Sequence, residues 1–137
     1  MIRGVHHIGI LVRDARATAE RFRTALGLEV TYWEDYGPGQ ALIGFIPVGG
    51  TLLELVQPLG EAGFGVEWLR ERGEGLQHVA FQVDDIDAAL ETLKSRGVEL
   101  QDDHARPGAA NTMIAFLGRG TVEGYMVELV QPPRAPR

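Results

Sequence analysis

The spacing of apolar residues changes along the chain, and each spacing predicts one kind of element. Within Val5–Val12, every second residue from Ile8 onward is apolar, which predicts a strand with two different faces. Asp14 can then cap a helix, because apolar residues recur after it at helical spacing. Gly27 can end that helix, since glycine readily adopts the left-handed conformation of helix C-termini.

More strand-like runs follow, separated by turns rich in glycine and proline. They are Leu28–Trp33, Ala41–Pro47 and Thr51–Gln57. Turns are expected at Gly37–Gly39 and Gly49–Gly50, which contain the residues that turns favour. A short helix is expected over Val66–Arg72, ending near Gly73.

The second half of the chain repeats this order of elements. Leu76–Val83 predicts a strand, and Asp84 or Asp85 can cap the helix after it. Gly97 can end that helix. Three more strands are expected at Val98–Gln101, Met113–Leu117 and Tyr125–Val130. The tail from residue 132 to residue 137 is expected to fray.

Identical residues also recur in the two halves. The pentapeptide Glu54–Pro58 returns unchanged as Glu128–Pro132, which is hard to attribute to chance. His7 and His78 each stand seven residues before an aspartate that can cap a helix. An internal duplication defines the architecture of a chain, so it takes precedence over any single motif.

The duplication predicts an α+β fold of two tandem βαβββ modules. Module 1 would cover residues 1–74 and module 2 residues 75–137, within one domain over residues 1–137. A chain of 137 residues is long enough to bury a hydrophobic core.

Composition excludes several classes of function. The net charge is -6, so no basic surface supports nucleic-acid binding. No cysteine is present, which excludes disulfides, thiolate zinc sites and cysteine nucleophiles. The chain has neither the apolar core of a signal peptide nor an apolar run of about 20 residues. A soluble, cytoplasmic protein without membrane contact is therefore expected.

The duplication aligns His7 with His78 and Glu54 with Glu128. A single histidine or glutamate in a strand is more often structural or solvated than functional. Two imidazoles and two carboxylates in symmetric positions, however, form a competent site for a divalent cation. Such a metal polarises a carbonyl and makes the adjacent C–H acidic.

Other polar residues are weaker candidates. Arg106, in an expected loop over residues 102–108, could meet an anionic group of a substrate. Gln40 and Gln82 could bind substrate if they point into the same site. His6 should point away from the face that carries His7, because successive strand residues alternate.

Two segments resemble the vicinal oxygen chelate superfamily, which includes glyoxalases and bleomycin resistance proteins. His6–Ile10 resembles the opening of its methylmalonyl-CoA epimerase branch, and Arg72–Phe81 resembles that branch's Gly-Glu-Gly segment. Arg106–Gly108 and Glu128–Val130 also fit, so the resemblance covers nearly the whole chain.

The resemblance implies a glyoxalase-like fold with a cupped mixed sheet, and a homodimer. It also implies one divalent metal ion per chain, held by His7, Glu54, His78 and Glu128. Co, Ni, Zn, Mn and Fe remain alternatives for that ion. The first-module ligand is commonly glutamine in the epimerases and glutamate in glyoxalase I, so Glu54 resembles the latter.

The chain also differs from these epimerases at the position of the general base. Epimerases of this type carry a carboxylate base on the strand before the first-module ligand, where this chain has no acid and Ile43 takes the matching position. Glu34 or Asp35 could replace it if their expected loop folds inward. Alternatively Glu54 or Glu128 could leave the metal and act as the catalytic base.

The leading hypothesis is a metal-dependent epimerase that removes a proton next to the carbonyl of an acyl-CoA. One alternative is a lactoylglutathione lyase, or glyoxalase I, acting on a hemithioacetal. A second is a ring-cleaving dioxygenase, for which Glu54 would be a surplus ligand. A third is a non-enzymatic drug-binding resistance protein, which the negative charge would suit.

Overall fold

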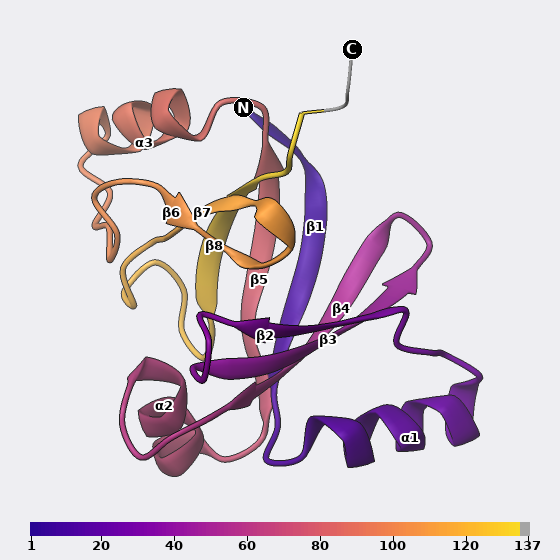
Figure 1. The fold of residues 1–137 in the computed structure, drawn as a ribbon. Helices are drawn as coiled ribbons and strands as arrows, with labels where there is room; N and C mark the ends of the chain where they lie inside the picture. Colours follow the sequence, from indigo (N-terminus) through magenta and orange to yellow (C-terminus); the bar gives the residue numbers. More distant parts are fainter. Residues whose placement is uncertain (135–137) are drawn as a thin grey trace. The chain divides into compact units, whose positions relative to one another are not determined.

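The computed structural model describes residues 1–134. In chain order the elements are β1 (Ile2–Leu11), α1 (Ala15–Leu26), β2 (Tyr32–Tyr36), β3 (Ala41–Val48), β4 (Thr51–Pro58), α2 (Phe64–Arg72), β5 (Gly75–Val83), α3 (Ile86–Ser95), β6 (Arg106–Pro107), the 3-10 helix η1 (Ala109–Asn111), β7 (Met113–Phe116) and β8 (Met126–Gln131). Figure 1 labels the strands and the α-helices. Among these described helices, none has both the length and the apolar character needed to cross a membrane. The part of the expected tail from residue 135 onward lies outside the described residues.

The chain forms two compact units. The first unit is His7–Gln77, and the second combines Met1–His6 with the chain from His78 onward. Strand β1 contributes residues to both units. The two units are described separately below.

In the first unit, β2, β3, β4 and β1 lie side by side in that order (Figure 1). Strand β1 runs parallel to β4, while β2, β3 and β4 are antiparallel neighbours. Helix α1 follows β1 and packs on one face of this sheet, where Val12, Ala15, Ile46 and Leu55 form a buried cluster. His7 of β1 and Glu54 of β4 lie on the opposite face of this sheet.

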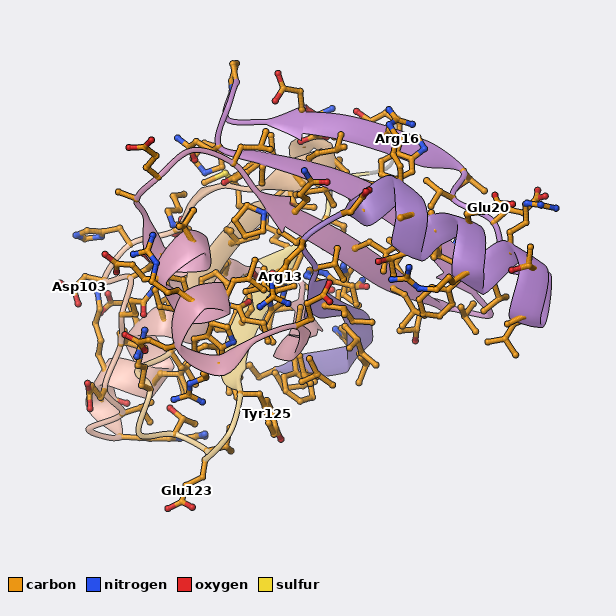
Figure 2. All side chains as sticks on the ribbon, turned by 90° about the horizontal axis from the view of Figure 1, so that it is seen from below. Arg13, Arg16, Glu20, Asp103, Glu123 and Tyr125 are labelled. Carbon is orange, nitrogen blue, oxygen red and sulfur yellow. The ribbon has the colours of Figure 1, made fainter. Side chains whose placement is uncertain are left out.

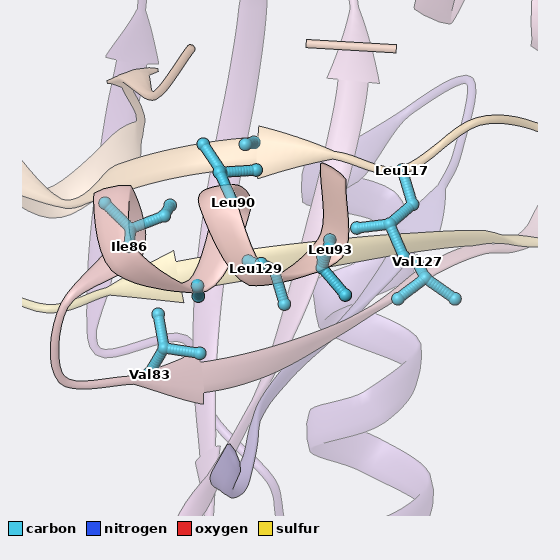
Figure 3. Close-up of a cluster of buried hydrophobic side chains, with 9 residues drawn as sticks. Val83, Ile86, Leu90, Leu93, Leu117, Val127 and Leu129 are labelled. Carbon is cyan, nitrogen blue, oxygen red and sulfur yellow. The ribbon is translucent and has the colours of Figure 1, made fainter. Parts of the chain in front are cut away.

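The second unit repeats this plan with β5, β8, β7 and β6. Strand β5 is parallel to β8, and the other pairs are antiparallel. Figure 3 shows α3 packing its apolar residues onto these strands. The labelled members of this buried cluster are Val83, Ile86, Leu90, Leu93, Leu117, Val127 and Leu129. Each unit therefore contains a strand followed by a helix that packs on its strands.

Helices α1 and α3 begin in the same way. Asp14 accepts a hydrogen bond from the backbone N–H of Ala17, and Asp85, rather than Asp84, does the same for Ala88. Both caps satisfy amide donors that the first helical turn leaves without intrahelical acceptors. Gly27 ends α1 in the left-handed conformation, as expected.

Some sequence-based assignments were wrong. The run Leu28–Trp33 is not a strand throughout, because β2 begins at Tyr32 and the apolar residues before it pack into the first unit's core as irregular chain. Val98–Gln101 forms only an isolated bridge at Leu100. Part of the expected 102–108 loop is a strand, since Arg106 pairs with β7. In each case a tertiary contact overrode the local pattern.

Candidate metal site

In the first unit, His7 and Glu54 form a buried pair. The register places Gly9 opposite Glu54, so His7, two residues earlier on β1, shares the face of Glu54. His7 Nδ1 lies 3.1 Å from Glu54 Oε2, and the two side chains are 5% and 8% exposed. Burial lowers the pKa of His7 to about 3, because the charged imidazolium would lose its hydration. The ring is therefore neutral near pH 7, which is the form that binds metals.

In the second unit, His78 and Glu128 are the equivalent pair. Ala80 is the register partner of Glu128, so His78 again precedes that partner by two residues. His78 Nε2 lies 3.9 Å from Glu128 Oε2, with side-chain exposures of 8% and 4%. The Phe116 ring meets the His78 ring edge-on, at 5.4 Å between centroids.

Burial is the largest influence on Glu128 and raises the pKa of its carboxyl group. The charges of His78, Arg106 and His6 oppose this rise. A cation near the carboxylate would therefore stabilise its ionised form. Glu128 is 3% exposed in β8.

The donor atoms of both pairs suit a divalent metal. Each unit holds one imidazole and one carboxylate on neighbouring parallel strands, away from bulk water. Imidazole nitrogen and carboxylate oxygen are ligands for zinc, manganese, iron, cobalt and nickel. The His/Glu side chains that the sequence predicts as ligands are thus chemically and structurally suited to bind a metal.

Arg106 is held beside the second pair. Its Nε donates to Asp102 Oδ1 at 3.2 Å, and its guanidinium carbon lies 5.8 Å from the centre of the Phe116 ring. Asp102 also accepts the backbone N–H of Phe116, at 2.8 Å. These contacts keep a cation close enough to Glu128 to lower the pKa of its carboxyl group.

The remaining predicted site residues have different environments. Gln82 is half-buried and follows His78 by four residues on β5, so both point to the same face of that strand. Gln40 is an exposed turn residue whose side chain lies over Gly37, and no described contact joins it to the first pair. His6 is half-buried and acts electrostatically on Glu128.

Two glutamines that support these pairs were missed in the sequence. Gln57 Oε1 accepts the backbone N–H of Ala15, and Gln131 Oε1 accepts that of Ile86, both at 2.9 Å. Each glutamine therefore links a glutamate-bearing strand to the helix that follows the histidine-bearing strand. The repeated pentapeptide was the available signal, because Gln57 and Gln131 recur with the glutamates.

Glu74, in the Gly-Glu-Gly segment, has a related structural role. Its Oε2 accepts the backbone N–H of Arg13 at 2.9 Å, and its Oε1 lies 3.5 Å from Arg13 Nη1. Arg13 lies between β1 and α1, directly before the helix cap. The motif therefore fixes the connection that leads away from His7.

The sequence of this chain, with its two buried His–Glu pairs on repeated strand–helix units, was compared with known protein families. Residues 6–116 match the model of the Glyoxalase/Bleomycin resistance protein/Dioxygenase superfamily. This match covers most of the chain, so the protein belongs to that superfamily.

The ethylmalonyl-CoA/methylmalonyl-CoA epimerase of Cereibacter sphaeroides is 33% identical over 133 residues, which are 96% of this chain and 99% of that protein. A variant of Streptomyces coelicolor methylmalonyl-CoA epimerase, solved with 2-nitronate-propionyl-CoA, has a TM-score of 0.91 and 29% identity, covering 99% of this chain and 100% of that chain. Lactoylglutathione lyase of Neisseria meningitidis is 26% identical, over 91% of this chain and 88% of that protein. The expected glyoxalase-like fold and the expected likeness to methylmalonyl-CoA epimerases are confirmed.

Proposed function

We propose that this protein is a metal-dependent epimerase that removes a proton next to the thioester carbonyl of a methylmalonyl-CoA-like substrate. The observation that carries the proposal is the repeated buried His–Glu pair. The resemblance to the superfamily assigns His7, Glu54, His78 and Glu128 to one divalent ion. Within each pair the donor atoms are buried and close together. When bound, the ion supplies Lewis acidity that makes a C–H beside a carbonyl easier to ionise.

The chain's own residues would prepare the site for this chemistry. The neutral imidazole of His7 can bind the ion without first releasing a proton. Burial of Glu54 and Glu128 excludes water that would otherwise compete for coordination. In the proposed role both glutamates act as ligands.

The names of the epimerase relatives favour an acyl-CoA substrate. Such a thioester carries phosphates, and a malonyl-type acyl group carries a carboxylate as well. Arg106 is the cation near Glu128 that we propose meets the acyl carboxylate, because a guanidinium pairs well with that group. Gln82 is proposed to line the same site from β5.

The alternatives have weaker support. Glu54 matches the first-module glutamate that the resemblance assigns to glyoxalase I, which keeps a lactoylglutathione lyase as the second candidate. A ring-cleaving dioxygenase would use two histidines and one glutamate, leaving the close contact of Glu54 with His7 without a role. Drug-binding proteins of this fold generally lack the ligand set.

Solvent exchange tests the proposal. Protein loaded separately with Co, Ni, Mn, Fe or Zn is incubated with methylmalonyl-CoA in D₂O, and deuterium at the acidic C–H is followed by NMR. We expect exchange and one metal per chain, both lost in His78→Ala and retained in the exposed control His104→Ala. Stoichiometric metal without exchange into the thioester would refute the epimerase, and turnover of a glutathione hemithioacetal would favour the lyase.

Three further expectations remain predictions alongside this function. The homodimer follows from the family resemblance, the cytoplasmic localisation from the sequence. The module boundary between residues 74 and 75 follows from the repeat alone. Each can be tested independently of the activity.

A further inference from the structure

The reaction proposed above needs a base, and strand β3 does not provide one. We call the sheet face that carries His7 and Glu54 the ligand face of the first unit. Phe45 is the register partner of Glu54, so Ala41, Ile43 and Phe45 present their side chains on this face. All three are apolar and buried. A carboxylate on this face must therefore come from another strand.

Strand β2 places a carboxylate, that of Glu34, on the ligand face. Glu34 is the register partner of Ile43, and Tyr32 is the register partner of Phe45. Register partners in antiparallel strands point to the same side of a sheet. The Tyr32 and Phe45 rings confirm this placement, since their centroids are 5.3 Å apart. Glu34 therefore lies on the ligand face, in a strand rather than in the loop expected from the sequence.

Trp33, between Tyr32 and Glu34, confirms this orientation because it lies on the opposite face of the sheet. Trp33 covers Gly44 so closely that an added Cβ would lie 2.8 Å from its Cζ3 atom. Arg16 of α1, labelled in Figure 2, stacks on the same Trp33 ring at 4.4 Å from its centre. Trp33 thus faces the helix, and its neighbours Tyr32 and Glu34 face away from it.

Tyr32 holds the Glu34 carboxylate in place. The Tyr32 hydroxyl donates to Glu34 Oε1 at 3.1 Å, and this bond raises the pKa of Tyr32 above its ordinary value. Glu54 shares its cross-strand row with Phe45 and Tyr32, so Glu34 lies two strands away from Glu54 and two residues further along the sheet. The backbones of the two glutamates are therefore about 12 Å apart. Both side chains stand on the ligand face, and the space between their carboxylates is where the reacting carbon and its carbonyl would lie.

We propose that Glu34 is the general base of the reaction and that Tyr32 is its positioning residue. The inference rests on the proposed function. The C–H bond next to the thioester carbonyl breaks, and its proton moves to a Glu34 oxygen. The bonding electrons form the enolate, whose charge resides on the former carbonyl oxygen, and nothing is oxidised or reduced. Glu34 exchanges this proton with solvent, and a solvent-derived proton or deuteron added to the same carbon completes exchange. Addition to the opposite face of the enolate inverts that carbon, while Glu54 remains a ligand.

The test compares metal-loaded wild type with Glu34→Gln, Glu34→Asp and Tyr32→Phe. Deuterium exchange into methylmalonyl-CoA, bound metal and thioester affinity are measured for each. Glu29→Gln is the matched control, because Glu29 is an exposed carboxylate just before β2. We expect Glu34→Gln to lose about 100-fold or more in exchange rate while keeping metal and affinity. Glu34→Asp should recover part of the rate, and Tyr32→Phe should lose roughly fivefold to tenfold.

The outcomes separate the two proposals. If wild type exchanges and Glu34→Gln stays within about threefold of it, Glu34 is not the base although the enzyme assignment stands. Loss of metal or thioester affinity in Glu34→Gln would likewise contradict a pure base role. If metal-loaded wild type shows no exchange, the epimerase assignment fails and the role of Glu34 fails with it.

Discussion

At the residue scale, burial determines the chemistry of the candidate ligands. His7 is almost fully enclosed, and the resulting low pKa makes its ring a neutral donor. Burial has the opposite effect on Glu128, because it raises the pKa of that carboxyl group. An isolated buried carboxylate is costly, so a bound cation would relieve part of that cost.

The His7 shift predicts a pH dependence for the metal-free protein. The folded pKa of about 3 lies below the ordinary 6.5, so the unfolded chain binds the proton more tightly. His7 therefore contributes stability that is present above pH 6.5 and is lost as pH falls toward 3. His7→Gln should reduce the acid slope of the unfolding free energy by up to about 1.4 kcal/mol per pH unit in this window.

Urea titrations between pH 4 and pH 7, with chelator present, would measure that slope. His104→Gln serves as the control, because His104 is exposed. Equal slopes for wild type and His7→Gln would show that the buried imidazole does not resist protonation.

At the element scale, the repeated pentapeptide connects strands to helices. Gln57 joins β4 to the first residue of α1, and Gln131 joins β8 to the first residue of α3. Both bonds satisfy amides at helix starts that no intrahelical carbonyl can reach. This shared role gives a physical reason for the glutamine to recur in both halves together with the glutamate.

Gln57→Ala should therefore lower the free energy of unfolding by about 1 kcal/mol, the usual effect of losing such a bond. Gln131→Ala should have a similar effect because its bond has the same length. Chemical denaturation measures both, and Gln101→Ala is the control because Gln101 is exposed. Unchanged stability in Gln57→Ala would mean that water replaces the glutamine at the helix start.

At the scale of the whole molecule, the central prediction is that the four ligands assigned by the family resemblance bind one ion per chain. A metal that binds only the folded state stabilises it by about 2.7 kcal/mol at one hundred times its dissociation constant. Glu54→Gln and His78→Ala come from different units, and each should remove most of this gain.

Thermal unfolding with and without metal would measure the gain for each variant. His104→Ala should respond as wild type does, since it lies outside the proposed ligand set. A gain that survives Glu54→Gln but not His78→Ala would place the ion in the second unit alone.

The sequence by itself determined the elements whose signals are local. Alternation revealed β1 and β5, Asp14 and Gly27 marked the ends of α1, and the repeated pentapeptide revealed the duplication. It also selected the four candidate ligands, because duplication aligns His7 with His78 and Glu54 with Glu128. These inferences succeed because helix caps and side-chain alternation depend on neighbours only a few residues away.

Only the tertiary structure decided the features that depend on register between distant segments. It placed Glu34 opposite Ile43, brought His7 Nδ1 to 3.1 Å from Glu54, and paired Arg106 with β7. The start of β2 at Tyr32 was decided in the same way. No local pattern encodes such pairings, because the register of a strand is set by the core it helps to bury and by partners far away in the sequence.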